Sequence, residues 1–550
     1  MAGGASTHRS KFVKNRLIAT VSAVALATVS TPAFAQHMHL PVMEMPAQKK
    51  PAAKKAPAQK PVAKKAPAAK QKVAPKPKAT ASKKTAAKPA KPVTAKPAPA
   101  QKPAEMPMDH SQMDHGAMEH APAVSAPSNP AAPMDPSRMD HSQMDHSQMD
   151  QGTMPMNASE HTGHGMAMTG ALGPYPMERE SSGTAWQPDT TEHSGLHVMS
   201  GDWSLMGHGV LNLVADHQSG RRGDDKVFAS GMLMGTARRP IGNGTLQFKA
   251  MLSPDPLMGK SGYPLLLASG ETANGVDRLI DRQHPHDFFM ELSGSISQNI
   301  GAKSSVFLYA GLPGEPAFGP PAFMHREAIL DSPEAPISHH WLDSTHITFG
   351  VVTAGLVVDR AKVEVSRFNA REPDQHRWNI ETGPPDSTSV RVSWNPTRTL
   401  ALQGSWGHFV DPEQLEPGEN QRRWSASALW ADEVAPGWKL ATTLAWGRKN
   451  AHGHKDDAIA AEASLKHEAW TLFGRGEITE NRELIEIEHA PAFRVGKLSA
   501  GVVRDFRIAE HLTLGAGGLL SVNFVPDGLA PLYGGQNPTG AMGFLRLKLD

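Results

Sequence analysis

The chain of 550 residues contains no cysteine. This absence excludes disulfide crosslinks, thiolate catalysis and cysteine-ligated zinc or iron–sulfur sites. It leaves histidine, methionine and the carboxylates as possible ligands for a transition metal. The sequence has 27 histidines and 26 methionines, so donors of both kinds are plentiful.

Long hydrophobic runs are also scarce. One apolar run extends from Leu17 to Val29, follows basic residues and precedes small residues that flank Phe34. This pattern predicts a signal peptide over residues 1–35, cleaved after Ala35. A membrane anchor is the alternative, but the run is shorter than the roughly 20 residues that a spanning helix needs. Since no second long apolar run follows, we expect any insertion into a membrane to use strands.

Residues 36–104 form a segment made mostly of lysine, proline and alanine. With hardly any large apolar side chains it cannot bury a core, so we expect a disordered, extended linker. It is either a passive tether or a cationic attachment to anionic lipid or cell-wall polymer. We expect no nucleic-acid partner, because the lysines have no interleaved aromatic residues for base stacking.

Residues 105–171, here called the Met/His arm, carry a repeated pentad, Met-Asp-His-Ser-Gln, which begins at Met108, Met139 and Met144. A period of five matches neither a helix face nor a strand face, so these residues are not spaced to pack a core. A low-complexity hydrophilic spacer is the alternative interpretation, but methionine is uncommon in such segments. The predicted metal ligands are Met108, His110, Met113, His115, Met118, His120, Met139, His141, Met144, His146, Met149, His161, His164, Met166 and Met168.

These donors suit copper. Thioether sulfur selects Cu(I) or Ag(I), and imidazole accepts Cu(II), Cu(I) and other divalent ions. We therefore expect the arm to bind copper ions as cargo, with silver as a second candidate, and to release them as histidine protonates below about pH 6.5. The Met-Asp-His repeats after a secretion signal resemble the N-terminal region of B-type copper-resistance outer-membrane proteins, over residues 106–168. Periplasmic copper-handling proteins are expected partners.

Residues 172–550 have ordinary complexity and short segments that alternate with a period of two. Trp424 and Trp430 share one face with small residues, opposite Arg423, Ser425 and Ser427. Such alternation fits a soluble sandwich or a membrane barrel. The paired tryptophans suit interfacial girdles, and many segments are long enough to cross a bilayer at a tilt. We predict an all-β fold, an antiparallel transmembrane β-barrel of roughly 12–16 strands in the outer membrane, preceded by a long disordered region in the periplasm.

Three motifs in this domain resemble an uncharacterised outer-membrane family found with metal-resistance functions: residues 259–264, 281–287 and 339–346. Loops around these motifs carry polar clusters: His284, His286 and Asp287; Met324, His325 and Glu327; His339, His340 and His346. If the loops fold together, these donors form a metal site at one mouth of the barrel. Otherwise the histidines cap turns and bond to backbone.

The sequence gives little indication of catalysis. Two histidines and a carboxylate can hold a catalytic metal, but no serine-hydrolase elbow is present, and the Lys260 region lacks the upstream glycine of a phosphate loop. We therefore expect a non-enzymatic, copper-binding outer-membrane protein of metal resistance, with lipid around its barrel. The alternative is a soluble, β-rich periplasmic metalloenzyme with a metal-loading arm.

Overall fold

The structure, a computed structural model, describes residues 169–192, 195–487 and 490–549. The signal peptide, the linker and all fifteen predicted ligands of the Met/His arm lie outside these residues and stay predictions. Within the described part of the chain, no helix is both long and apolar enough to cross a membrane.

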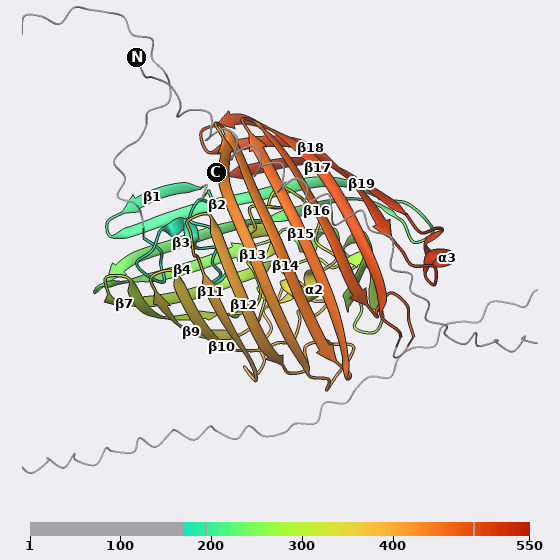
Figure 1. Cartoon of the computed structure of the whole chain (residues 1–550), viewed down its shortest axis with the longest axis horizontal. Coiled ribbons are helices and arrows are strands. Elements are labelled where there is room, and N and C mark those ends of the chain that lie inside the picture. The colour runs from blue at the N-terminus through green and yellow to red at the C-terminus, as the bar shows by residue number, and fades with distance from the viewer. Residues whose placement is uncertain (1–168, 193–194, 488–489, 550) are drawn as a thin grey trace, which may run out of the picture. The chain divides into compact units, whose positions relative to one another are not determined.

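Sixteen antiparallel strands form a closed ring (Figure 1). In order around the ring they are β2 (Trp203–Gln218), β3 (Asp225–Ile241), β4 (Gly244–Leu252), β7 (Phe289–Gly301), β8 (Ser304–Gly311), β9 (Val351–Val358), β10 (Ala361–Phe368), β11 (Ser387–Trp394), β12 (Leu400–Phe409), β13 (Gln421–Ala435), β14 (Trp438–Ala451), β15 (His454–His467), β16 (Trp470–Asn481), β17 (Phe493–Ala509), β18 (Leu512–Phe524) and β19 (Thr539–Leu549). The predicted barrel is confirmed, at the upper end of the expected strand number.

The other elements are short. Strand β1 (Leu196–Ser200) pairs with the start of β2, and β5 (Tyr263–Thr272) pairs with β6 (Arg278–Gln283) in a separate hairpin. The α-helices of the described residues are α2 (His339–Leu342) and α3 (Ala530–Tyr533). The same part of the chain has four 3-10 turns, at Met177–Arg179, Asp255–Met258, Phe323–His325 and Ser344–His346.

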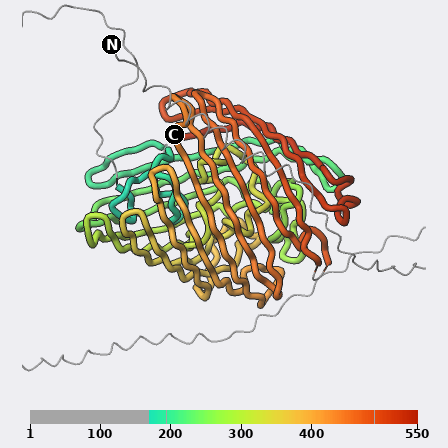
Figure 2. Tube along the Cα trace, in the orientation of Figure 1, coloured from blue at the N-terminus to red at the C-terminus, as the bar shows by residue number. Residues whose placement is uncertain are grey.

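The ring closes where the last strand meets the first strand of the barrel. Strand β19 pairs with β2 from Gly540 opposite Gln218 to Leu549 opposite Gly209. Figure 2 shows the blue-green beginning and the red end of the barrel side by side at this seam. Closure matters because it leaves no long unpaired strand edge, and backbone groups inside a bilayer need such pairing.

The two faces of the wall differ as the alternation predicts. Leu213, Leu444 and Leu545 point outward and keep 53, 58 and 52% of their surface exposed. Arg423 and Ser425 point inward and are buried. An apolar exterior on a closed antiparallel ring is the arrangement of a transmembrane barrel, so the soluble alternative is not favoured.

Several segments fill the lumen, and at least two of them bond directly to the inside of the wall. The first, residues 169–192, is here called the inner tail. Inward-facing Ser297 on β7 and Ser305 on β8 donate hydrogen bonds to Ala171 O and Leu172 O, at 2.7 and 2.6 Å. Asn395, just after β11, donates to Gln187 O at 2.8 Å. The inner tail therefore lies against the inside of the wall.

The second segment is the long connection between β8 and β9, residues 312–350, here called the plug loop. Arg326 forms two hydrogen bonds to Glu462 on β15, at 2.7 and 2.8 Å. Further along the loop, Glu334 is ion-paired with Lys497 on β17, and Ser338 Oγ donates to a carboxylate on β16. These wall partners lie on three neighbouring strands, β15, β16 and β17, far around the ring from β8 and β9, where the loop begins and ends. The plug loop therefore extends across the lumen.

Candidate metal centre

Five buried histidines gather inside the barrel. The connection between β6 and β7 supplies His284 and His286, and the plug loop supplies His339, His340 and His346. Ring centroids lie 5.1 Å apart for His286 and His346, 5.1 Å for His339 and His346, and 5.8 Å for His284 and His339. None of these residues is more than 8% exposed. The loops do bring these donors together, though in the buried interior rather than at an open mouth.

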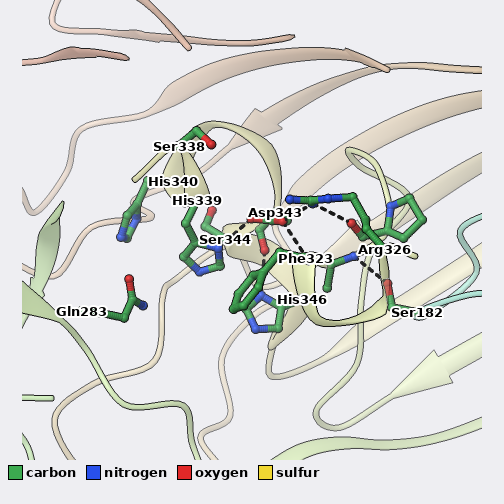
Figure 3. A network of polar contacts seen from close by, with 12 residues as sticks. Ser182, Gln283, Phe323, Arg326, Ser338, His339, His340, Asp343, Ser344 and His346 are labelled. Carbon is green, nitrogen blue, oxygen red and sulfur yellow. Dashed lines mark hydrogen bonds and ion pairs between the residues drawn. The ribbon is translucent and has the colours of Figure 1, made fainter. Parts of the chain in front are cut away.

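Asp343 organises the half of this histidine cluster that comes from the plug loop (Figure 3). One turn of helix separates it from His339, whose Nδ1 lies 2.6 Å from Asp343 Oδ1. The backbone oxygen of Asp343 lies 2.7 Å from His346 Nδ1. Its Oδ2 accepts hydrogen bonds from Arg326 Nη1 at 2.5 Å and from the Phe323 backbone nitrogen at 3.0 Å. One aspartate thus orients two imidazoles and is itself fixed by a buried cation.

A second aspartate orients His286. Its Nδ1 lies 2.8 Å from Asp255 Oδ2, in the 3-10 turn after β4. Because Asp255 and Asp343 offer acceptors to Nδ1 of His286, His339 and His346, the Nδ1 atoms carry the hydrogens and the lone pairs lie on Nε2. The Nε2 atoms of His286 and His346 are buried without a hydrogen-bond partner. Metal-binding histidines show this arrangement, with the other ring nitrogen held by a carboxylate or carbonyl.

Burial keeps two imidazoles of the cluster, those of His339 and His346, neutral. It lowers the pKa of His339, and lowers that of His346 well below the usual range. A neutral imidazole is the form that ligates a metal. These two side chains therefore need not lose a proton before binding at neutral pH.

His284 and His340 are occupied by carboxylates. Nε2 of His284 lies 3.0 Å from Glu271, and Nδ1 of His340 lies 3.3 Å from Glu372. Burial opposes protonation of His340, but the Glu372 carboxylate outweighs it and raises the pKa. A Cβ on Gly270, whose φ is +111°, would lie 2.7 Å from His340 Nε2, so a larger residue would displace this ring.

Asp287 is buried beside the cluster. Burial raises the pKa of its carboxyl to about 7, and neither oxygen has a hydrogen-bond partner. Arg377 Nη1 lies 3.5 Å away. The Asp287 carboxylate next to His286 therefore caps no turn and is available as a further metal ligand.

The third predicted group separates from the cluster. Glu327 pairs with Lys466 on β15 at 2.6 Å. The His325 ring lies 6.4 Å from the ring of His208 on β2, and Met324 packs among other methionines. Met324, His325 and Glu327 therefore contact different parts of the barrel and do not join the five histidines.

The ligand atoms of the histidine cluster lie further apart than those around a bound metal ion. In the described ranges, the one group of three or more His, Asp or Glu side chains with ligand atoms all within 4.8 Å is Glu413, Glu416 and Glu483. Arg278 occupies that group, at 2.9 Å from Glu416 and 2.5 Å from Glu483. Donors around a tetrahedral ion lie about 3.4 Å apart, so an ion would draw the histidines inward.

Comparisons with known proteins locate similar barrels but no family. No family model matches the chain, and no curated protein matches it. Among solved structures, OmpT of Vibrio cholerae, described as outer-membrane expressed, is 8% identical with a TM-score of 0.37, covering 64% of this chain and 100% of its own. An anion-selective porin from Comamonas acidovorans is 12% identical with a TM-score of 0.36, covering 63 and 99%. Salmonella typhi OmpF, in complex with daunomycin, is 10% identical with a TM-score of 0.42, covering 64 and 100%.

The fold of this chain rests on its own strand pairing, since the matched structures are remote. Both family resemblances, to B-type copper-resistance proteins and to the metal-resistance barrel family, stay predictions. Sequence reasoning missed Asp255 and Asp343, which orient the histidines. Asp343 could have been found, because it follows His339 by four positions, one helical turn.

Proposed function

We propose that the chain is an outer-membrane protein of metal resistance that binds copper on its Met/His arm and in the histidine cluster of its barrel. The observation that carries this proposal is the set of three buried imidazoles, His286, His339 and His346, each with Nδ1 anchored. The ring of His346 lies 5.1 Å from each of the other two, and Nε2 of His286 and of His346 is buried without a hydrogen-bond partner. Such a site suits Cu(II), and the thioethers of the arm suit Cu(I). No covalent step is assigned to either.

The orientation of the barrel supports a periplasmic arm. At one end the strands are joined by two-residue turns, such as residues 242–243, 359–360 and 436–437. The other end carries the long connections, including the plug loop. Outer-membrane barrels have short turns on the periplasmic side. Thr169, where the described chain begins, accepts a hydrogen bond from Arg238 near the short-turn end of β3.

The inner tail gives the arm a direct route to the barrel. The arm's predicted donors His164, Met166 and Met168 precede Thr169 immediately in the sequence. Copper captured on the arm would therefore reach the barrel at its periplasmic end. Periplasmic copper-handling proteins are the proposed source of the metal.

Titration of the detergent-solubilised full chain with Cu(II), followed by electron paramagnetic resonance, tests the barrel site. The double variant His286→Asn/His346→Asn is expected to bind about one copper fewer per chain, because it removes two of three anchored donors. The control is His217→Asn, since His217 forms an exposed pair with Asp225 at 2.5 Å. Equal copper stoichiometry in the double variant and the control would refute the barrel site.

A further inference from the structure

A second group of soft donors lies beside the histidine cluster. Four of the six buried members of one core cluster are methionines: Met232 and Met234 on β3, Met251 on β4 and Met290 on β7. Met206 on β2 and Met324 of the plug loop pack against them. These six residues are here called the methionine cluster.

The strand register points these side chains at one another. Met234 lies directly opposite Met251 on β4 and directly opposite His208 on β2. Side chains at such positions have Cβ atoms about 4.5–5.5 Å apart. Met232 faces inward two residues along β3, so its thioether lies on the same side of the wall as that of Met234.

A bulge adds the fourth buried sulfur. Met251 pairs with Glu291 and Leu252 pairs with Phe289, which leaves Met290 as the extra residue on β7. Bulges re-aim side chains, and they are common next to functional sites. Met290 is fully buried as a result.

Methionine as a core filler is the simpler explanation, but its distribution argues against it. Another core cluster of the barrel, which includes Leu265 and Phe473, has 21 buried members and one methionine among them, Met542. Inward positions further along β2, such as Asn212 and Asp216, are polar. Packing alone gives no reason to concentrate thioethers at this one place on the wall.

Asp255 links the histidine cluster to the strand that carries Met232 and Met234. Asp255 Oδ2 contacts His286, and Asp255 Oδ1 accepts a hydrogen bond from the backbone of Gly231, next to Met232, at 3.2 Å. On the plug loop, Ile347 packs in the same hydrophobic core as the methionine cluster and directly follows His346. The two sets of donors are therefore adjacent.

We propose that the methionine cluster is a separate site for a soft monovalent ion, Cu(I) or Ag(I). Neutral thioethers bind such ions and discriminate against Mg(II) and Ca(II). Buried Glu291, opposite Met251, supplies negative charge close to the site, although Lys249 shares it at 3.7 Å. The inference rests on the proposed function, since it gives the barrel a site for the reduced form of the same cargo.

The test uses the full chain labelled with 13C at the methionine methyl groups, folded in detergent and incubated with Ag(I) until the spectrum is constant. The methyl resonances of Met232, Met234, Met251 and Met290, assigned by single leucine substitutions, are expected to shift together along one saturation curve, separate from that of the arm methyls. Met542 is the internal control and is expected to stay unshifted.

The double variant Met234→Leu/Met251→Leu keeps the packed volume, because leucine and methionine exchange with little strain. It is expected to weaken Ag(I) binding at the remaining cluster methyls at least tenfold. Cluster methyls that do not move, while arm methyls do, would overturn this inference and leave the proposed function standing. If neither arm nor cluster responds, both fail. An equal shift at Met542 would also overturn the inference, as non-specific binding.

Discussion

Replacing Arg326 with methionine should release the plug loop. The Arg326 side chain is fully buried, and it bridges Glu462 on the wall and Asp343 in the loop. It also donates to the backbone oxygen of Pro321 at 2.9 Å. Methionine fills similar space but leaves the two carboxylates without their shared cation.

The magnitude follows from the loss of one partner in a buried ionic group, which costs about 3–5 kcal/mol. Since about 1.4 kcal/mol is a factor of ten, the ratio of displaced to docked plug should rise by roughly a hundredfold to a few thousandfold. Arg475 compensates only in part, because it lies 3.9 Å from Glu462 and is paired more closely with Glu477, at 3.2 Å. The barrel should survive, since its strands pair independently of the loop.

Conductance of single barrels in a planar bilayer measures this ratio. A 16-stranded ring is wide enough for a water-filled channel, so displacement of the plug loop should make Arg326→Met conduct far more often than the parent. Arg371→Met, which breaks a half-exposed pair with Asp386, is the control. The double variant Arg326→Met/Glu462→Met should conduct less often than Arg326→Met, because it also removes the Glu462 carboxylate that the single variant leaves without its cation. Unchanged conductance in Arg326→Met, with heat-modifiable gel mobility showing a folded barrel, would refute the reasoning.

Three further outcomes are expected. Asp343→Asn should weaken copper binding in the barrel about 10–100-fold, because the carboxylate orients His339; calorimetry that shows the parent affinity would contradict this. Leu545→Arg should destabilise the barrel by about 2–4 kcal/mol in urea unfolding from lipid vesicles, because Leu545 faces lipid near the middle of β19; an unchanged midpoint would count against a membrane exterior. Deleting residues 106–168 should lower copper bound per chain; equal binding in both Cu(I) and Cu(II) titrations would contradict an arm that carries metal.

The wall of the barrel could be predicted because it depends on local alternation. Arg423, Ser425 and Ser427 face the lumen, and Trp424 faces outward, as the period of two predicts. Each of these assignments needs only the residues next to it in the sequence.

The interior could not be predicted in the same way. Arg326 and Glu462 are 136 positions apart, and His284 and His339 are 55 apart, so no local spacing relates them. Their contact depends on a long loop that folds back into the ring. The histidine-rich loops were therefore visible in the sequence, while their convergence and the anchoring aspartates were not. The methionine cluster left one signal, the alternating Met232 and Met234 on β3.

The seam between β2 and β19 constrains how the protein is assembled. The inner tail precedes β2 in the chain, yet it is enclosed by a barrel that closes only when β19, which follows all the other strands in sequence, pairs with β2. Either the inner tail and the plug loop already lie in the lumen when β19 pairs with β2, or they must enter a barrel that has already closed. During insertion into the membrane, the barrel therefore either closes around an inner tail and plug loop that are already in place, or stays open between β2 and β19 until both have entered.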